Sequence, residues 1–194
     1  MTKRVSLATI ATVLVAAVAF VVAASAQNAH LRNNVRPNPA FRDNGLTLTA
    51  TAAYAGLGHF DTLQNLSATA NPTADCVNPG TGEHRPPGQN PASANVTGST
   101  AVPAGDIRNG NVTISTTTNA PVSPIPGAPN CPNPNWVENI TDLAFTSATI
   151  TLFQDSNQNG TFEAGELVLT VSCTFNTPTS NGSVPSSNYS CTVS

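Results

Sequence analysis

Apolar side chains recur at every second position over much of this chain, and that period restricts the folds open to it. From Leu46 to Tyr54 they alternate with threonines, and Leu167 to Phe175 repeats the pattern with polar partners. A period of two is typical of a β-strand with one buried face, whereas a helix needs a period near 3.6. Comparable runs occupy residues 60–70, 96–102, 110–117, 141–153 and 188–193.

Turn-forming residues separate these runs, and no segment between them has a helical period. Asn71-Pro72 and Asn181-Gly182 are examples of dipeptides that end a strand or turn the chain. About seven short strands divided by such turns predict an all-β protein, an antiparallel β-sandwich.

One predicted strand, residues 141–153, changes the face that it buries. Its apolar residues Leu143 and Phe145 are odd-numbered, whereas Ile150 and Leu152 are even-numbered. A β-bulge near residues 146–148, or a strand that passes from one sheet to the other, would produce this change of phase.

The N-terminus has the features of a secretory signal peptide. Lys3 and Arg4 precede an apolar run from Leu7 to Val22, and Ala24-Ser25-Ala26 is a small-residue cleavage site. We therefore expect residues 1–26 to be removed and the mature protein to be secreted. No second long apolar run follows, so no transmembrane segment is expected after cleavage.

Residues 27–44 are polar, carry two prolines and lack apolar periodicity. This predicts an extended arm or linker before a single domain of residues 45–194. Arg32, Arg36 and Arg42 make the segment basic, so a strand-donating or wall-contacting arm is the alternative to a plain spacer. After the predicted cleavage site, five arginines and ten acidic residues give a net charge of −5. Nucleic acid is not an expected partner, because its recognition needs a basic face.

Four cysteines in an exported chain predict two disulfide bonds, for which three connectivities exist. Cys76 and Cys131 both lie in loops rich in Asn and Pro, which favours that pair. Cys173 and Cys191 would then join the last two strands. The spacings are wide and Cys-x-x-Cys is absent from the sequence, so metal binding by these thiols is disfavoured.

Two long segments rich in Asn and Pro, residues 75–93 and 119–134, interrupt the strands. Loops of this length are often functional. Trp136, the only tryptophan, follows the second loop. An aromatic face can stack on a sugar ring while polar groups orient it. Trp136 and the 75–93 loop are therefore the candidate ligand-binding residues of an extracellular carbohydrate-binding module, and a core position for Trp136 is the alternative.

The segment from Asp155 to Glu166 resembles an EF-hand calcium loop. Oxygen-bearing side chains occupy its first, third, fifth, ninth and twelfth positions, and a glycine occupies the sixth, where the chain must turn sharply. Calcium prefers six to eight oxygen ligands, which alternate side chains on a tight loop can supply. The resemblance implies Ca²⁺ bound by the side chains of Asp155, Asn157, Asn159, Glu163 and Glu166 and by the backbone carbonyl of Thr161.

The segments beside this loop differ from those of an EF-hand. Residues 148–154 and 167–175 alternate with a period of two, so the loop is expected on a β-hairpin rather than between helices. Two usual acids are amides here, which predicts a weak dissociation constant of about 10⁻⁴ to 10⁻³ M. A polar turn without calcium is the alternative, because Asn-Gly is itself a hairpin signal. Calcium on a hairpin would order that hairpin rather than move helices.

Tyr189-Ser190-Cys191 resembles the Tyr-x-Cys motif of immunoglobulin domains, which implies an immunoglobulin-like sandwich. His30, His59 and His84 are scattered and no Gly-x-Ser-x-Gly occurs, so we do not expect an enzyme. The sequence instead predicts a structural or adhesive module at the cell surface, with itself or another extracellular protein or glycan as partner.

Overall fold

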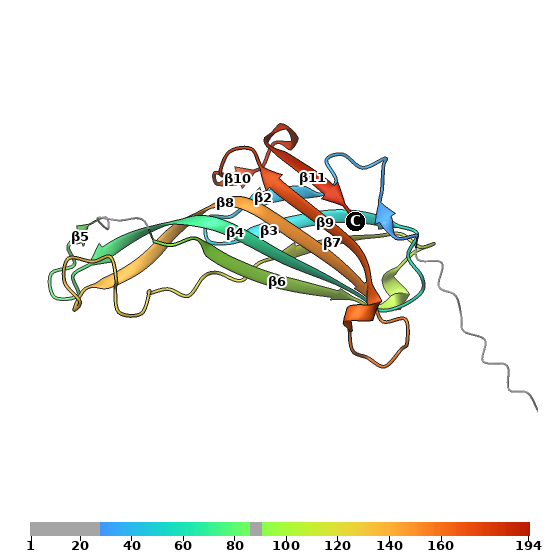
Figure 1. Cartoon of the computed structure of the whole chain (residues 1–194), viewed down its shortest axis with the longest axis horizontal. Coiled ribbons are helices and arrows are strands. Elements are labelled where there is room, and N and C mark those ends of the chain that lie inside the picture. Colours follow the sequence, from blue (N-terminus) through green and yellow to red (C-terminus); the bar gives the residue numbers. More distant parts are fainter. Residues whose placement is uncertain (1–27, 86–90) are drawn as a thin grey trace, which may run out of the picture.

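The computed structural model describes residues 28–85 and 91–194. Within these ranges the strands form two antiparallel sheets that pack against each other (Figure 1). The predicted signal peptide and its cleavage site lie outside the described residues. In the part of the chain that is described, no helix has the length and apolar character needed to cross a membrane.

The first sheet, named the β3 sheet, has β3 between β7 on one side and β1 and β2 on the other. Its strands are β1 (His30–Leu31), β2 (Ala40–Asp43), β3 (Leu48–Ala55), β7 (Val112–Thr117) and β10 (Gly182–Ser183). In the second, named the β4 sheet, the order is β11-β9-β8-β4, and the far side of β4 pairs with β6 and β5. Its strands are β4 (Thr62–Val77), β5 (His84–Arg85), β6 (Ala94–Val102), β8 (Val137–Gln154), β9 (Leu167–Phe175) and β11 (Tyr189–Val193).

The seven longer strands correspond to the runs that the sequence predicts, so the all-β fold with antiparallel sheets is confirmed. β4 differs in its length, because it continues through Pro72 instead of ending there. The N–H of Leu143, the partner of Pro72 on β8, donates to Gly45 rather than to β4. The nitrogen of Pro72 therefore points away from β8, and β6 pairs with β4 only as far as Ala70, so no ladder hydrogen bond is lost there.

The described part of the predicted arm, residues 28–44, is not a free arm but belongs to the β3 sheet. β1 and β2 both pair with β3, and the side chain of Phe41 is only 3% exposed. Phe41 packs edge to face on Phe175 and Tyr189 of the β4 sheet. A four-residue strand between prolines and a turn is too short for a periodic pattern to reveal it.

The predicted change of phase in β8 is confirmed as a β-bulge. Thr69 of β4 pairs with Ser147 and the next residue, Ala70, pairs with Phe145, so Thr146 is the extra residue. Because of this insertion, Phe145 and Ala148 both face the core and are both buried.

One side of the sandwich is closed where β6 meets β7. Asn119 donates its N–H to the carbonyl of Thr97 at 2.8 Å, which joins the two sheets beyond the end of β7. At Gly98 a side chain is impossible without movement, because a Cβ atom would lie 2.1 Å from the carbonyl oxygen of Thr117. The backbones therefore approach closely on this side, and glycine is the residue that permits it.

A hydrogen-bonded trio joins the sheets inside the core. The hydroxyl of Tyr54 donates to Oε1 of Gln64 at 2.6 Å, and Nε2 of Gln64 donates to Oγ1 of Thr116 at 2.9 Å. All three side chains are fully buried, and burial raises the pKa of Tyr54 above its ordinary value, so the hydroxyl stays a donor. Buried polar groups that are all paired fix one packing of the sheets.

Removal of one member of this trio should be costly. Tyr54→Phe leaves the Gln64 amide oxygen buried without its donor, which lowers the free energy of unfolding by about 1–3 kcal/mol. Urea denaturation measures this change. The control is Thr51→Val, which removes an exposed hydroxyl pair with Ser115 and should cost less than about 0.5 kcal/mol. If the two variants lose the same free energy of unfolding, the buried trio contributes no more to stability than an exposed hydroxyl pair.

Candidate calcium site

The loop predicted to bind calcium connects β8 to β9 and projects from one end of the sandwich (Figure 1). It is therefore flanked by strands of one hairpin, as the sequence predicts. Its last turn is a 3₁₀ turn, η2 (Ala164–Glu166), that leads directly into β9.

Asp155, the first position of the loop, lies at the base of the hairpin and is 4% exposed. Its two carboxylate oxygens accept backbone N–H groups from across the loop, Oδ1 from Asn159 at 3.1 Å and Oδ2 from Gly160 at 2.8 Å. Gly160 has a φ of +77°, a conformation that side chains disfavour. Asp155 thus closes the loop into a ring of backbone around its carboxylate.

The two amides in the middle of the loop form successive turns around their own oxygens. Oδ1 of Asn157 accepts the N–H of Asn159 at 3.0 Å, and Oδ1 of Asn159 accepts the N–H of Thr161 at 2.8 Å. Side-chain oxygens that bind a backbone N–H two residues later hold the chain in a tight turn. All three residues are exposed.

Glu166, the last position, returns the chain to the base of the loop and is 4% exposed. Its Oε1 accepts the N–H of Asn157 at 3.2 Å, and its Oε2 accepts the N–H of Glu163 at 3.2 Å. Glu163 is exposed, and its Oε1 accepts the Nδ2 group of Asn159 at 3.1 Å. Hydrogen bonds therefore connect the predicted ligands of the first, third, fifth, ninth and twelfth positions.

The charges of this loop fit a cation. Asp155 and Glu166 are buried carboxylates that accept hydrogen bonds from neutral donors only. Across residues 28–85 and 91–194, the single ion pair joins Arg85 to Glu83, so neither carboxylate has a cationic side chain as partner. An uncompensated buried charge is unfavourable, and a carboxylate has about four acceptor sites, so lone pairs remain for a metal.

A calcium ion here would need more than the carboxylates. Among the described residues, no three His, Cys, Asp or Glu side chains gather as a metal-binding group. The amide oxygens of Asn157 and Asn159 and the carbonyl of Thr161 would therefore have to complete the shell. Such mixed oxygen ligands suit calcium, a hard cation, better than zinc.

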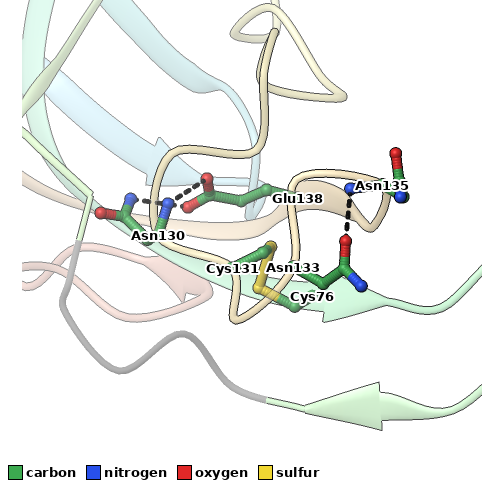
Figure 2. The surroundings of a disulfide bond; sticks show 6 residues. All are labelled: Cys76, Asn130, Cys131, Asn133, Asn135 and Glu138. Atoms are coloured by element: carbon green, nitrogen blue, oxygen red, sulfur yellow. Dashed lines mark hydrogen bonds between the residues drawn. A yellow bond between two sulfur atoms is a disulfide. The ribbon is translucent and has the colours of Figure 1, made fainter.

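Both predicted disulfide bonds form. Cys76 is joined to Cys131, and Cys173 to Cys191. The first bond anchors the 119–134 segment to the far end of β4 (Figure 2). The second joins neighbouring strands, β9 and β11, of the same sheet.

Figure 2 also shows an acidic residue that the sequence analysis missed, Glu138 beside the Cys76–Cys131 bond. Its side chain is fully buried, and its carboxylate accepts the backbone N–H of Asn130 at 3.3 Å and the Nδ2 group at 2.8 Å. No sequence signal marks this contact, because Asn130 lies in an irregular loop whose course the disulfide sets.

Trp136, the candidate sugar platform, is partly exposed at the same end of the molecule. The guanidinium carbon of Arg85 lies 5.9 Å from the centroid of its ring. Arg85 also forms an ion pair with Glu83 at 2.7 Å. Any ligand that stacks on the Trp136 ring would therefore lie next to an exposed charged pair.

The loop, the disulfides and Trp136 are therefore the features from which a function can be argued. Comparison with protein-family models, with curated proteins and with solved structures finds no match to this chain.

Proposed function

We propose that the protein is a secreted, calcium-stabilised β-sandwich that serves as a non-enzymatic structural or adhesive module outside the cell. The observation that carries the proposal is the β8–β9 loop, whose buried Asp155 and Glu166 have no cationic side chain as partner. Millimolar calcium is an extracellular condition, and a site of weak expected affinity matches it.

The two disulfides support the extracellular part of the proposal. Disulfides persist in oxidising compartments and are rare in the cytosol of mesophiles. Here they lie far apart on the molecule, one at the end of the β4–β8 ribbon and one between β9 and β11 (Figure 1). Such cross-links stabilise the folded protein by restricting its unfolded chain.

The shape supports a structural or adhesive role. β4 and β8 remain paired to Val77 and Val137, well past the end of the β6 ladder at Ala94, and form an elongated ribbon (Figure 1). Along its side lies the polar 119–134 segment, with Val122 77% exposed. An elongated body with exposed loops offers contact surface to another copy, to an extracellular protein or to a glycan.

Of the immunoglobulin-like architecture that the sequence predicts, the proposal keeps only the arrangement in two packed sheets. The Tyr-x-Cys motif of that family precedes a cysteine that joins two sheets, whereas Cys191 is bonded within one sheet. The hydroxyl of Tyr189 donates to the distant carbonyl of Pro39, rather than to the backbone a few residues upstream. These two contacts favour a sandwich with a connectivity of its own.

Calcium chelation tests the proposal. A ligand that binds only the folded state at about 10–100 times its dissociation constant stabilises it by about 1.4–2.7 kcal/mol. Addition of about 10 mM calcium to chelated protein should therefore raise the melting temperature by about 3–10 °C, while magnesium should not. Glu166→Gln should abolish the calcium response. An unchanged melting temperature in the wild-type protein would refute the calcium site.

Self-association can be tested separately, by sedimentation velocity over a range of protein concentrations with and without calcium. A module that assembles with itself should show a weight-average mass that rises with concentration. A monomer at all concentrations would leave adhesion to a different molecule as the structural role.

The second candidate, a carbohydrate-binding module, is favoured by the partly exposed Trp136, whose ring lies next to Arg85 of the 75–93 segment. Residues 86–90 of that segment lie outside the described residues. A ligand that stacks on Trp136 would either displace the Arg85 side chain from the ring or bind next to it. The expected ligand is therefore one that tolerates a guanidinium group nearby. Loss of binding to insoluble polysaccharide in Trp136→Ala, with binding retained in Phe153→Leu, would favour this candidate over a structural module.

A further inference from the structure

The side of the sandwich opposite the β6–β7 contact holds an open groove between the two sheets. One wall is the β1–β2 segment, residues 30–38, and the other is β11, near the C-terminus (Figure 1). The groove has a volume of about 670 Å³, within the range of ligand sites in proteins. Tyr189, Cys191 and Val193, alternate residues of β11, line it.

The backbone of β11 has a free edge toward this groove. Ser194 and Thr170 exchange both of their backbone hydrogen bonds, at 2.9 and 2.8 Å, and Asn176 donates to Asn188 at 2.7 Å. Hydrogen-bonded pairs alternate along an antiparallel ladder. The N–H and C=O groups of the three residues that line the groove therefore point away from β9.

The disulfide gives independent support for this register. The Cα atoms of Cys173 and Cys191 are 4.1 Å apart. A separation near 4.5 Å is typical of pairs without mutual backbone hydrogen bonds, whereas hydrogen-bonded pairs lie near 5.5 Å apart. Cys191 thus stands at a position whose backbone groups are directed outward, and in the described residues β11 pairs only with β9.

The groove is positively charged on an acidic protein. Arg32 and Arg36 line it, and its lining contains no Asp or Glu. In the described ranges neither arginine forms an ion pair. Apolar groups stand beside these cations, among them Leu31, Val35 and Val193, and Val193 is 53% exposed.

The wall that carries the arginines is held in place by hydrogen bonds. The side-chain amide of Asn38 donates to the carbonyls of Arg32 and Ala53 at 3.1 and 2.8 Å, and its Oδ1 accepts the N–H of Ala53 at 3.0 Å. From the other wall, the hydroxyl of Tyr189 donates to the carbonyl of Pro39 at 2.7 Å. A groove with both walls fixed needs little ordering when a ligand enters.

We propose that this groove binds an extended acidic segment of a partner protein, which adds as a strand to the free edge of β11. Backbone hydrogen bonds to Tyr189, Cys191 and Val193 would hold the segment, and its carboxylates would face Arg32 and Arg36. A glycan could meet the arginines, but only a peptide matches the regular spacing of donors and acceptors along a strand edge. This proposal rests on the proposed adhesive role, for which it names the kind of partner that is bound. It does not depend on the calcium site.

The test uses a fluorescein-labelled octapeptide of alternating Glu and Val, with fluorescence anisotropy of the mature protein as readout. Because successive side chains of a strand point to opposite faces, either the Glu or the Val side chains of this peptide can face the groove. The peptide should bind, and affinity should fall with salt. A Lys-Val peptide should bind at least about tenfold more weakly, as expected when unlike charges become like charges. Two further peptides carry N-methyl groups at alternate residues, one on every Glu and the other on every Val. The peptide whose methyl groups fall on the residues that face β11 should not bind, whereas the other should, because only every second residue of an added strand directs its N–H toward the edge.

Matched variants locate the site. Arg36→Glu should weaken binding by about tenfold or more, whereas Arg108→Glu, an exposed arginine outside the groove, should not. Melting curves show whether both variants fold. On peptide binding, hydrogen exchange at the amides of Cys191 and Val193 should slow. Binding of both N-methylated peptides as tightly as the unmodified one, or binding of polygalacturonate without binding of the Glu-Val peptide, would overturn strand addition. A failed calcium response would leave these results unaffected.

Discussion

Asp155→Ala is expected to lower the free energy of unfolding by about 3–6 kcal/mol in about 10 mM calcium. The substitution removes a carboxylate that is 4% exposed and that accepts the N–H groups of Asn159 and Gly160. Hydrogen bonds to a charged acceptor contribute about 1.5–3 kcal/mol, and the loss of bound calcium adds about 1.4–2.7 kcal/mol. Urea denaturation of the two proteins, with calcium and with chelator, measures both contributions.

Two comparisons separate these contributions. In chelator, the cost of Asp155→Ala should fall to that of the hydrogen bonds alone. Asp155→Asn keeps an acceptor oxygen but removes the charge, so it should lose most of the calcium response and less of the stability in chelator. If Asp155→Ala costs the same in calcium and in chelator, the loop is a hydrogen-bonded turn and not a metal site.

Much of the fold follows from local pattern, because a buried sheet face imposes a period of two on any strand that covers it. The change of parity between Phe145 and Ile150 predicts either a bulge or a strand that changes sheets, and the structure has the bulge, with Thr146 as the inserted residue. β2 was not predicted, since four residues between prolines and a turn carry no measurable period. Its place in the sheet depends on Phe41, whose aromatic partners Phe175 and Tyr189 lie more than a hundred residues away.

The candidate calcium site likewise has local features, which the sequence predicts, and non-local features, which it does not. The turns around Asn157 and Asn159 are local, and the spacing of side-chain oxygens predicts them. The burial of Asp155 and Glu166 is not local, because it depends on where β8 and β9 meet the rest of the sandwich. The sequence shows that the segment with Arg32 and Arg36 is basic, but no pattern in it predicts the groove beside β11. Its arginines and its strand edge are about 150 residues apart, and only the packing of the two sheets brings them together.

The Cys76–Cys131 bond is expected to stabilise the protein more than the Cys173–Cys191 bond does. It closes a loop of 55 residues, against 18 for the other. In the chain-entropy account, loops of these lengths correspond to about 4 and 3 kcal/mol. The longer loop also places Asn130 against Glu138, so its release would leave a fully buried carboxylate without its donors. That second effect makes the difference between the two bonds larger than loop length alone predicts.

Urea denaturation of two double variants measures this difference. Cys76→Ala with Cys131→Ala should cost about 4 kcal/mol or more, and Cys173→Ala with Cys191→Ala about 3 kcal/mol. Addition of Glu138→Gln to the first pair separates the two effects, since a neutral amide is less costly to bury without its donors than a carboxylate. If Glu138→Gln recovers part of the lost stability in that background but not in the wild-type protein, Asn130 is the group that the disulfide holds against the carboxylate. A larger loss from the Cys173–Cys191 pair would contradict both the entropic and the electrostatic arguments.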